Sequence, residues 1–202
     1  MRQSITLNTP NAQRIYNRTY EEVGRNLYSV NVVSRMVVKD DEAVDELNRL
    51  IDERFAATQE EVDAEIERIK TLRDQNGIEA LPEYTNPHTF ECEISTPATL
   101  KYIKLVKGID EISMLLDSLW LMEEITDKQK LSEEYRWQST MIKLSNQFRD
   151  LYNRSRAASK RQRKEEAEEN TKRKAEKRAS QPNEGDPTQP SNDDSLDLAA
   201  AQ

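Results

Sequence analysis

The first residues of the chain alternate between polar and apolar side chains, a pattern that predicts a β-strand. Ile5 and Leu7 fall on one side of this strand, and four polar side chains fall on the other: Arg2, Ser4, Thr6 and Asn8. Thr9-Pro10 then predicts the start of a helix, because threonine can accept a hydrogen bond from an amide of the first turn and proline has no N–H to satisfy. We expect a short helix over residues 11–20.

Two further helices are predicted in the first half of the chain. Residues 27–39 contain many β-branched side chains, which favour a strand, but their apolar positions recur at helical spacing, and we predict a helix. Residues 40–41 can cap a long helix, whose apolar positions from Val44 to Ile69 repeat with an eleven-residue period. Asn76-Gly77 is typical of a helix end, because both residue types tolerate a left-handed backbone.

The second half of the chain begins with another alternating strand, over residues 90–94. Its apolar side carries three residues: Phe90, Cys92 and Ile94. Thr96-Pro97 repeats the helix-start pattern found near the beginning of the chain. The most apolar segment, residues 98–125, therefore predicts either one buried central helix or two helices that bend at Gly108.

Two apolar stripes run along the next segment, which Thr126-Asp127 can cap as a helix. The first stripe follows a heptad pattern: Trp137, Met141, Leu144, Phe148 and Leu151. The second stripe lies beside it: Leu131, Tyr135, Ile142 and Tyr152. Two stripes on one helix favour contacts both within the domain and with another chain, so we predict a homodimer through the heptad stripe. The alternative is that this stripe packs entirely within one chain.

The end of the chain carries too few apolar residues to form a core. No large apolar residue occurs between Tyr152 and Leu196, so residues 160–178 predict an exposed helix and residues from 181 onward predict disorder. We therefore divide the chain into a helical DNA-binding and dimerisation domain (1–155), a basic charged helix or linker (156–180) and a disordered acidic tail (181–202).

Composition supports a mainly α fold, with short N-terminal β-structure and long helices. The 202 residues are 35% hydrophobic and 34% charged, with only four glycines for tight turns. One cysteine and one histidine leave no internal disulfide and no Cys/His zinc site, and we expect no enzyme, metal, cofactor or small-molecule substrate. Without a signal segment or a membrane span, we expect a bacterial cytoplasmic protein, held at the nucleoid through DNA.

Charge is strongly segregated along the chain, although the net value is −8. Residues 1–39 carry a charge of +4 and residues 149–178 carry +6, whereas residues 40–79 carry −9 and the last 22 residues carry −5. Two separate basic segments favour an anionic partner, and the partner that we predict is double-stranded promoter DNA. The alternative is that these charges only solvate exposed helices.

The polar side of the first strand has the chemistry needed to contact DNA bases. A two-stranded β-ribbon fits the major groove, where Arg2, Ser4, Thr6 and Asn8 would face base edges. One short strand cannot form a ribbon alone, so a second copy of the chain would have to pair with it. The second strand is a poor candidate for contact with bases, because the carboxylates of Glu91 and Glu93 would be repelled by DNA phosphates. The alternative for the first strand is an ordinary sheet edge, which shows the same alternation of polar and apolar residues.

Phosphate contacts are expected from both basic segments. In the first segment we predict Arg14 and Arg18, with Arg25 in the same role. In the second segment we predict a run without aromatic residues: Arg154, Arg156, Lys160 and Arg161. A run of this kind favours contact with a duplex backbone over stacking on single-stranded bases.

Two parts of the chain resemble a family encoded by conjugative plasmids and integrating conjugative elements, the AcaB-like regulators. The first part is the opening motif: Ile5, Thr6, Leu7, Thr9, Ala12, Arg14, Ile15, Tyr16 and Arg18. The second runs from Ser95-Thr96-Pro97 through Asp110-Glu111 to Thr126-Asp127. The resemblance covers roughly residues 3–155. It implies a dimeric DNA-binding fold related to ribbon-helix-helix proteins and an activator of conjugation genes.

Two functions remain open at this point. The first is a dimeric, sequence-specific DNA-binding regulator that activates conjugative-transfer genes. The second is a helical scaffold or adaptor of a mobile-element transfer complex that does not read DNA sequence.

Overall fold

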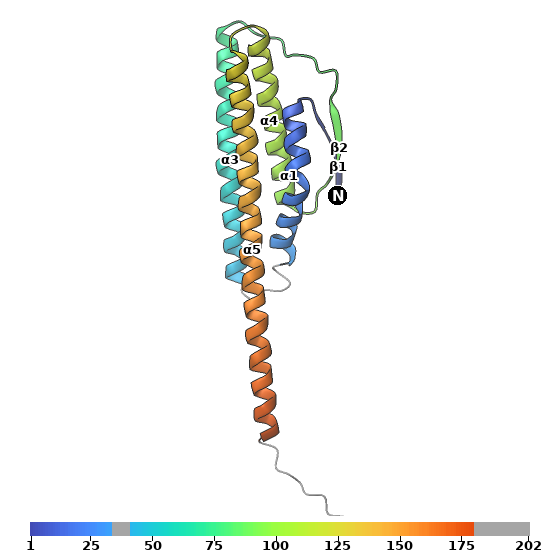
Figure 1. Cartoon of the computed structure of the whole chain (residues 1–202), viewed down its shortest axis with the longest axis vertical. Coiled ribbons are helices and arrows are strands. Elements are labelled where there is room, and N and C mark those ends of the chain that lie inside the picture. Colours follow the sequence, from blue (N-terminus) through green and yellow to red (C-terminus); the bar gives the residue numbers. More distant parts are fainter. Residues whose placement is uncertain (34–40, 180–202) are drawn as a thin grey trace, which may run out of the picture. The chain divides into compact units, whose positions relative to one another are not determined.

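The structure is a computed structural model that describes residues 1–33 and 41–179, and it has a mainly α fold, as predicted (Figure 1). The described residues form two strands, β1 and β2, four α-helices and one π-helical segment. Their bounds are β1 Arg2–Leu7, α1 Pro10–Tyr28, η1 Ser29–Val33, α3 Asp41–Gln75, β2 His88–Glu93, α4 Pro97–Leu121 and α5 Asp127–Ala179. The chain forms two compact units, of which the first covers residues 1–162 and the second begins at residue 163. The predicted divisions at residues 155 and 180 stay predictions.

Three helices begin with the capping residues that the sequence indicates. The Thr9 hydroxyl accepts a hydrogen bond from the Ala12 amide at 3.3 Å, and the Thr96 hydroxyl accepts one from Thr99 at 3.2 Å. Before α5, Thr126 and Gln129 form a reciprocal capping box, in which each side chain accepts a hydrogen bond from the backbone of the other residue.

The first helix is longer than predicted. It continues from the expected end at residue 20 to Tyr28, because Val23 and Leu27 extend its buried side. The predicted helix over residues 27–39 is helical over its described part, first as the end of α1 and then as η1. Residues 34–39 lie outside the described part of the chain.

The end of α3 uses the expected glycine. Gly77 has a φ of 66°, and the amide of Ile78 donates to the Arg73 carbonyl at 2.9 Å. The Gly77 amide donates to Asp74 at 3.1 Å, which completes a Schellman motif. Because Ile78 is also buried, this motif fixes the direction in which the chain leaves α3.

The most apolar segment forms one helix, α4, rather than two. Gly108 has a packing role instead of a hinge role, because a β-carbon at this position would lie 2.6 Å from Cγ1 of Val62. The missing side chain therefore allows α3 and α4 to approach closely.

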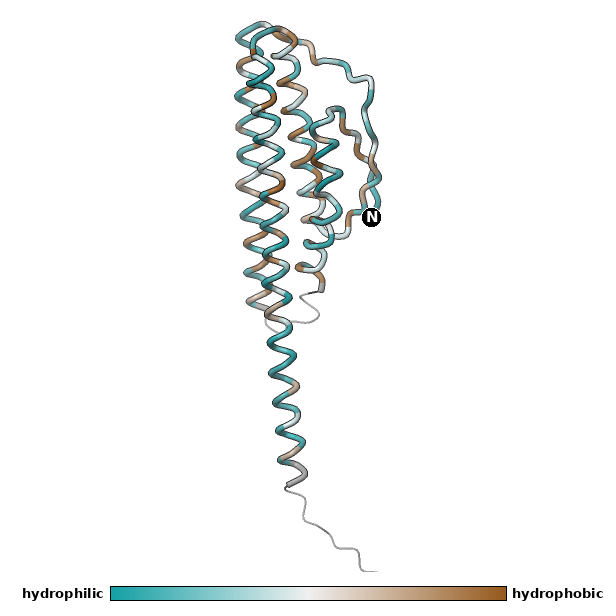
Figure 2. The backbone as a smooth tube through the Cα atoms, viewed as in Figure 1, coloured by the Kyte–Doolittle hydropathy of each residue, from teal (hydrophilic) through white to brown (hydrophobic). Residues whose placement is uncertain are grey.

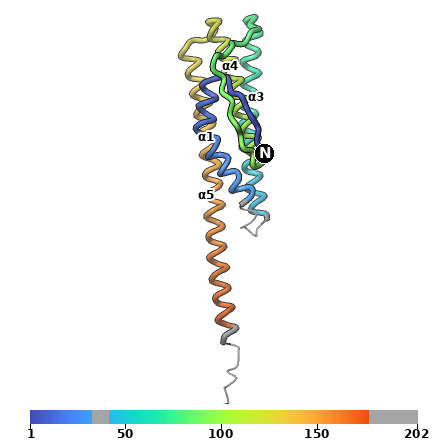
Figure 3. Tube along the Cα trace, turned by 90° about the vertical axis from the view of Figure 1, so that its right-hand side faces the viewer, coloured from blue at the N-terminus to red at the C-terminus, as the bar shows by residue number. Residues whose placement is uncertain are grey.

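The two strands pair with each other within one chain, in an antiparallel arrangement. The register places Arg2 opposite Glu93 and Ile5 opposite Phe90, and Figure 3 shows the strands side by side. Their apolar side packs on α1, where the Tyr16 hydroxyl lies 3.3 Å from the Cys92 sulfur. The expectation that β1 finds its partner in a second copy is therefore wrong for this edge of the strand.

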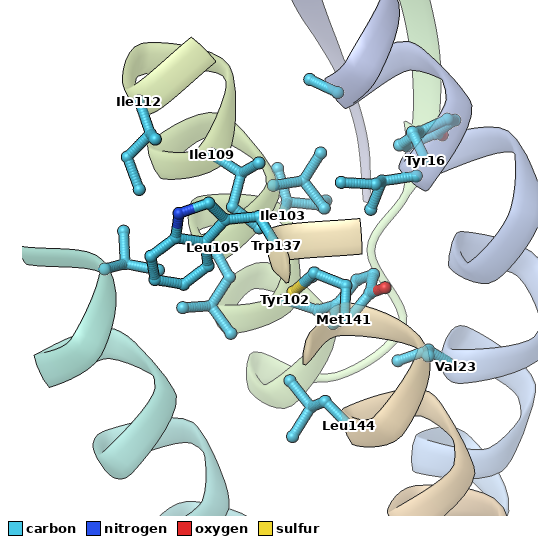
Figure 4. Packing of buried hydrophobic residues seen from close by; sticks show 14 of the residues in the cluster. Tyr16, Val23, Tyr102, Ile103, Leu105, Ile109, Ile112, Trp137, Met141 and Leu144 are labelled. Carbon is cyan, nitrogen blue, oxygen red and sulfur yellow. The ribbon is translucent and has the colours of Figure 1, made fainter. Parts of the chain in front are cut away.

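The heptad stripe of α5 belongs to the core of its own chain. Its five residues are at most 8% exposed: Trp137, Met141, Leu144, Phe148 and Leu151. Figure 4 shows Trp137 and Met141 among side chains of α4, and the Phe148 ring lies 4.9 Å from that of Phe55 in α3. The prediction of a dimer interface here is wrong, because these side chains have no apolar surface left for a partner.

The second stripe of α5 is exposed to solvent over part of its length, unlike the buried heptad stripe. Leu131 is 63% exposed and Tyr135 is 71% exposed, whereas Ile142 and Tyr152 are half-buried. Beyond this region, the described end of α5 is mainly hydrophilic (Figure 2). Residues 163–179 are helical and their described side chains are mostly exposed, as expected, while the predicted disordered tail (181–202) lies outside the described residues.

Candidate nucleic-acid interface

The outer side of the two-stranded sheet carries part of the predicted reading surface. Arg2, Ser4 and Thr6 are exposed. The Ser4 hydroxyl donates to the Glu91 carboxylate at 2.7 Å, and the hydroxyls of Thr6 and Thr89 lie 2.9 Å apart. This side also carries Glu93 opposite Arg2, so two carboxylates outnumber one guanidinium and would repel DNA phosphates.

Asn8 does not lie on this reading surface. It is half-buried, its backbone N–H donates to the Asp110 carboxylate at 2.9 Å, and its side-chain amide donates to the same group at 3.2 Å. The side-chain amide also points to the sulfur of Met114 at 3.5 Å. The prediction that Asn8 contacts bases is therefore wrong, because its donors attach the end of β1 to α4.

The predicted arginines of α1 lie on the helix surface beside α5. Arg14, Arg18 and Arg25 are exposed, and their spacing places them on one side of α1. Burial raises the pKa of Glu134 in α5, against the opposing attraction of Lys130 and Arg14. Arg14 is therefore close enough to α5 for its charge to act on Glu134.

The two basic segments meet where the second half of α1 lies against α5. Arg149 of α5 forms an ion pair with Glu22 of α1 at 3.5 Å. Next to this pair is an open pocket of about 450 Å³, lined from both helices by Arg25, Asn26, Tyr28, Arg149, Tyr152 and Asn153. Segments far apart in sequence thus place two guanidinium groups around one cavity.

The predicted basic run of α5 continues from this pocket. Arg154, Arg156, Lys160 and Arg161 are all exposed. Arg156 follows Arg149 by seven residues and Lys160 follows by another four, so these three positions share one side of the helix. Arg154 and Arg161 lie on a different side, and the four predicted residues therefore do not form one row.

Arg149 and Asn153 are the residues that reasoning from sequence missed. Arg149 was counted in the basic block, but its role follows only from the contact with α1. Its seven-residue spacing from Arg156 was the available signal.

Two further residues with reactive side chains, Cys92 and His88, lie on β2. Cys92 is buried, and burial raises the pKa of its thiol, which keeps it protonated at neutral pH. His88 is exposed, and its ring lies against Phe90. Within residues 1–33 and 41–179, no group of three acidic, histidine or cysteine side chains is placed to hold a metal ion.

The fold of the chain is similar to that of a solved structure. The crystal structure of selenomethionine-containing AcaB from uropathogenic E. coli superposes with a TM-score of 0.79 and 28% sequence identity, over 83% of this chain and 86% of that chain. No protein-family model matches the chain, and no curated protein matches its sequence. Within the described part of the chain, no helix combines the length and the apolar character needed to cross a membrane.

Proposed function

The chain has an AcaB-like fold, and from this premise we propose that it is a dimeric, sequence-specific DNA-binding regulator of conjugative-transfer genes, acting as an activator. The structural match over most of both chains carries this proposal. The resemblance of the sequence to the AcaB-like regulators, over roughly residues 3–155, implies a regulator of this kind.

We place the contact with the DNA backbone on the basic side formed by α1 and α5. Arg18 and Arg25 on α1 and Arg149, Arg156 and Lys160 on α5 are exposed cations on helices that lie against each other. Contacts of this type supply affinity without sequence information. The DNA sequence would then be recognised by a few side chains that contact base edges, and exposed Arg2 on β1 is the best remaining candidate for this role.

The proposed dimer uses the unpaired edge of β1. Reciprocal backbone hydrogen bonds join Met1 and Ile94, so in an antiparallel sheet the even-numbered residues of β1 direct their N–H and C=O groups away from β2. The edge of the two-stranded sheet therefore offers the backbone groups of Arg2, Ser4 and Thr6 to a second copy. Such pairing would place Arg2, Ser4 and Thr6 of both copies on the same side of one β-ribbon.

The dimer is tested by removing one of these N–H groups. Ser4→Pro deletes the N–H without removing a backbone hydrogen bond to β2. Ser4→Ala keeps the N–H and loses the same hydroxyl contact with Glu91, so it is the matched control. We expect light scattering at micromolar concentration to show a dimer for wild type and Ser4→Ala, and a monomer for Ser4→Pro. A monomeric wild type, or a dimer that Ser4→Pro leaves intact, contradicts this interface.

DNA recognition is tested by titrating the full chain into labelled DNA from upstream of conjugation operons, at ~150 mM salt with excess competitor DNA. A specific regulator retains its complex under competition, because specific sites bind typically ~10³-fold or more tightly than random DNA. Loss of the complex to competitor, or no binding, contradicts sequence-specific recognition.

The second candidate function is a protein-binding scaffold, and one surface favours it. Leu81, Leu121 and Met122 are about half exposed, at 46%, 58% and 59%. They line an open groove of about 310 Å³ beside the end of α4. Contiguous apolar surface of this kind is typical of contacts between proteins. A chain that fails the competition experiment but binds a protein of the transfer complex would have this function.

A further inference from the structure

We infer that the pocket between α1 and α5 binds one phosphate group of the DNA backbone, held by Arg25 from one helix and Arg149 from the other. This inference rests on the proposed function and assigns part of the DNA contact to a defined site.

The donors around the pocket fit a phosphate group. Arg25 and Arg149 both line the cavity of about 450 Å³, and Asn153 adds a side-chain amide next to Arg149. Guanidinium groups donate two parallel hydrogen bonds to phosphate oxygens, which gives geometric selection as well as attraction. Because the two arginines come from different helices, one bound phosphate would connect α1 to α5.

A buried donor without a partner lies in the wall of the same pocket. Asn26 is only 8% exposed, and its side-chain Nδ2 makes no hydrogen bond within the described part of the chain. Buried amide groups without an acceptor are rare, because they lose their hydrogen bonds to water. This Nδ2 atom is closed to water in the free protein, so a bound phosphate would have to shift the pocket wall slightly to give the amide an acceptor.

Glu22 determines how strongly the pocket attracts an anion. Its carboxylate lies 3.5 Å from Arg149, so it occupies one of the two guanidinium groups in the free protein. With Arg25, Arg149 and Glu22 together, the site retains one net positive charge. Phosphate binding would exchange the Glu22–Arg149 ion pair for a phosphate–Arg149 pair.

The position of the pocket suits a continuous DNA backbone contact. Arg156 and Lys160 extend the side of α5 that carries Arg149, and Arg18 lies on the same side of α1 as Arg25. At ~1.5 Å per residue, Arg156 follows Arg149 by about 10 Å along the helix. The pocket therefore lies between exposed cations that could contact the neighbouring phosphates of the same DNA backbone.

The test compares matched charge changes inside and outside the pocket. Glu22→Gln frees Arg149, and we expect DNA affinity to rise several-fold, whereas Glu21→Gln changes the charge by the same amount on an exposed neighbour and should have less than a twofold effect. Arg149→Gln should weaken binding by about tenfold and reduce the salt slope by about one unit, while Lys143→Gln on another side of α5 should not. Equal effects within each pair of variants would overturn the phosphate site.

A second measurement separates this inference from the proposed function. Inorganic phosphate is titrated into the full chain while nuclear magnetic resonance follows the side-chain amides of Asn26 and Asn153. Saturable shifts in wild type that disappear in Arg149→Gln support the site, even if no DNA binds and the proposed function fails. If DNA binds specifically but neither the amide shifts nor the matched variants distinguish the pocket, the site is overturned and the function stands.

Discussion

The Asp110 carboxylate of α4 accepts hydrogen bonds from both the backbone N–H and the hydroxyl of Thr9, at 2.8 and 2.7 Å, although the two residues are 101 positions apart. Both residues are buried, and the same carboxylate accepts two further donors from Asn8. One side chain of the central helix therefore fixes the corner between β1 and α1, from which the basic side of α1 is positioned.

Replacing Asp110 with asparagine should strongly destabilise the fold. The amide keeps the shape but removes the charge and turns one acceptor into a donor, which we expect to lower the free energy of unfolding by about 2–4 kcal/mol. Urea unfolding measures this value. The neighbouring Glu111→Gln loses only an exposed ion pair with Lys70 and should cost less than about 1 kcal/mol. Equal losses in the two variants would show that the Asp110 contacts are not important for stability.

Gly108→Ala should be destabilising although alanine favours helices. The new methyl group would meet Val62, which is fully buried and has a stiff β-branched side chain. We expect this clash to lower the free energy of unfolding by about 1–3 kcal/mol, whereas the higher helix propensity of alanine raises it by about 1 kcal/mol. At Gly24, a new β-carbon would meet no described atom within 4 Å beyond its chain neighbours and the local helix backbone, so Gly24→Ala should stabilise α1 by about 0.5–1 kcal/mol. Thermal unfolding of the Val62→Ala background provides the check, since Gly108→Ala should cost little there. A penalty that persists in this background would exclude the contact with Val62 as its cause.

Phe148→Ala should unfold the protein rather than separate two copies. Its ring is 1% exposed and packs on Phe55, so we expect a loss of about 3–5 kcal/mol. Tyr135→Ala, on the exposed part of the same helix, should remain within about 0.5 kcal/mol of wild type. Sedimentation and urea unfolding distinguish the outcomes: a stable, dissociated Phe148→Ala variant would restore the heptad stripe as a dimer interface.

Local signals made most elements of the fold predictable. Thr9-Pro10, Thr96-Pro97 and Asn76-Gly77 act through hydrogen bonds to neighbours in sequence, and the structure has a helix boundary at each. The heptad stripe predicted burial of Trp137 correctly, but a repeat along one helix does not say whether the covering helix belongs to the same chain.

The candidate site was less predictable because it depends on distant pairings. The contact of Asn8 with Asp110 and the pairing of Ser4 with Glu91 join residues that no local pattern connects. The Glu22–Arg149 pair is of the same kind. Charge segregation identified both basic segments, but only the packing of α1 on α5 shows which arginines share a surface.

Exposed cations of α5 should contribute to DNA affinity without changing sequence preference. Arg156→Ala and Lys160→Ala should each weaken binding to preferred and random DNA alike, and each should reduce the slope of log affinity against log salt by about one unit. Fluorescence anisotropy across a salt series measures the slope. In contrast, Arg2→Ala should cost about 1–3 kcal/mol on the preferred site only. Altered sequence preference in the α5 variants would place base reading on α5 instead of β1.

The most direct test of DNA-sequence recognition is a nuclease footprint of the full chain on DNA from its own genetic neighbourhood, at ~150 mM salt with excess random competitor. A sequence-specific dimer predicts a bounded protected segment with two related half-sites, protected at the same protein concentration. Uniform weak protection that disappears with competitor would contradict the account. So would the absence of protection at protein concentrations at which a known regulator saturates its own preferred DNA.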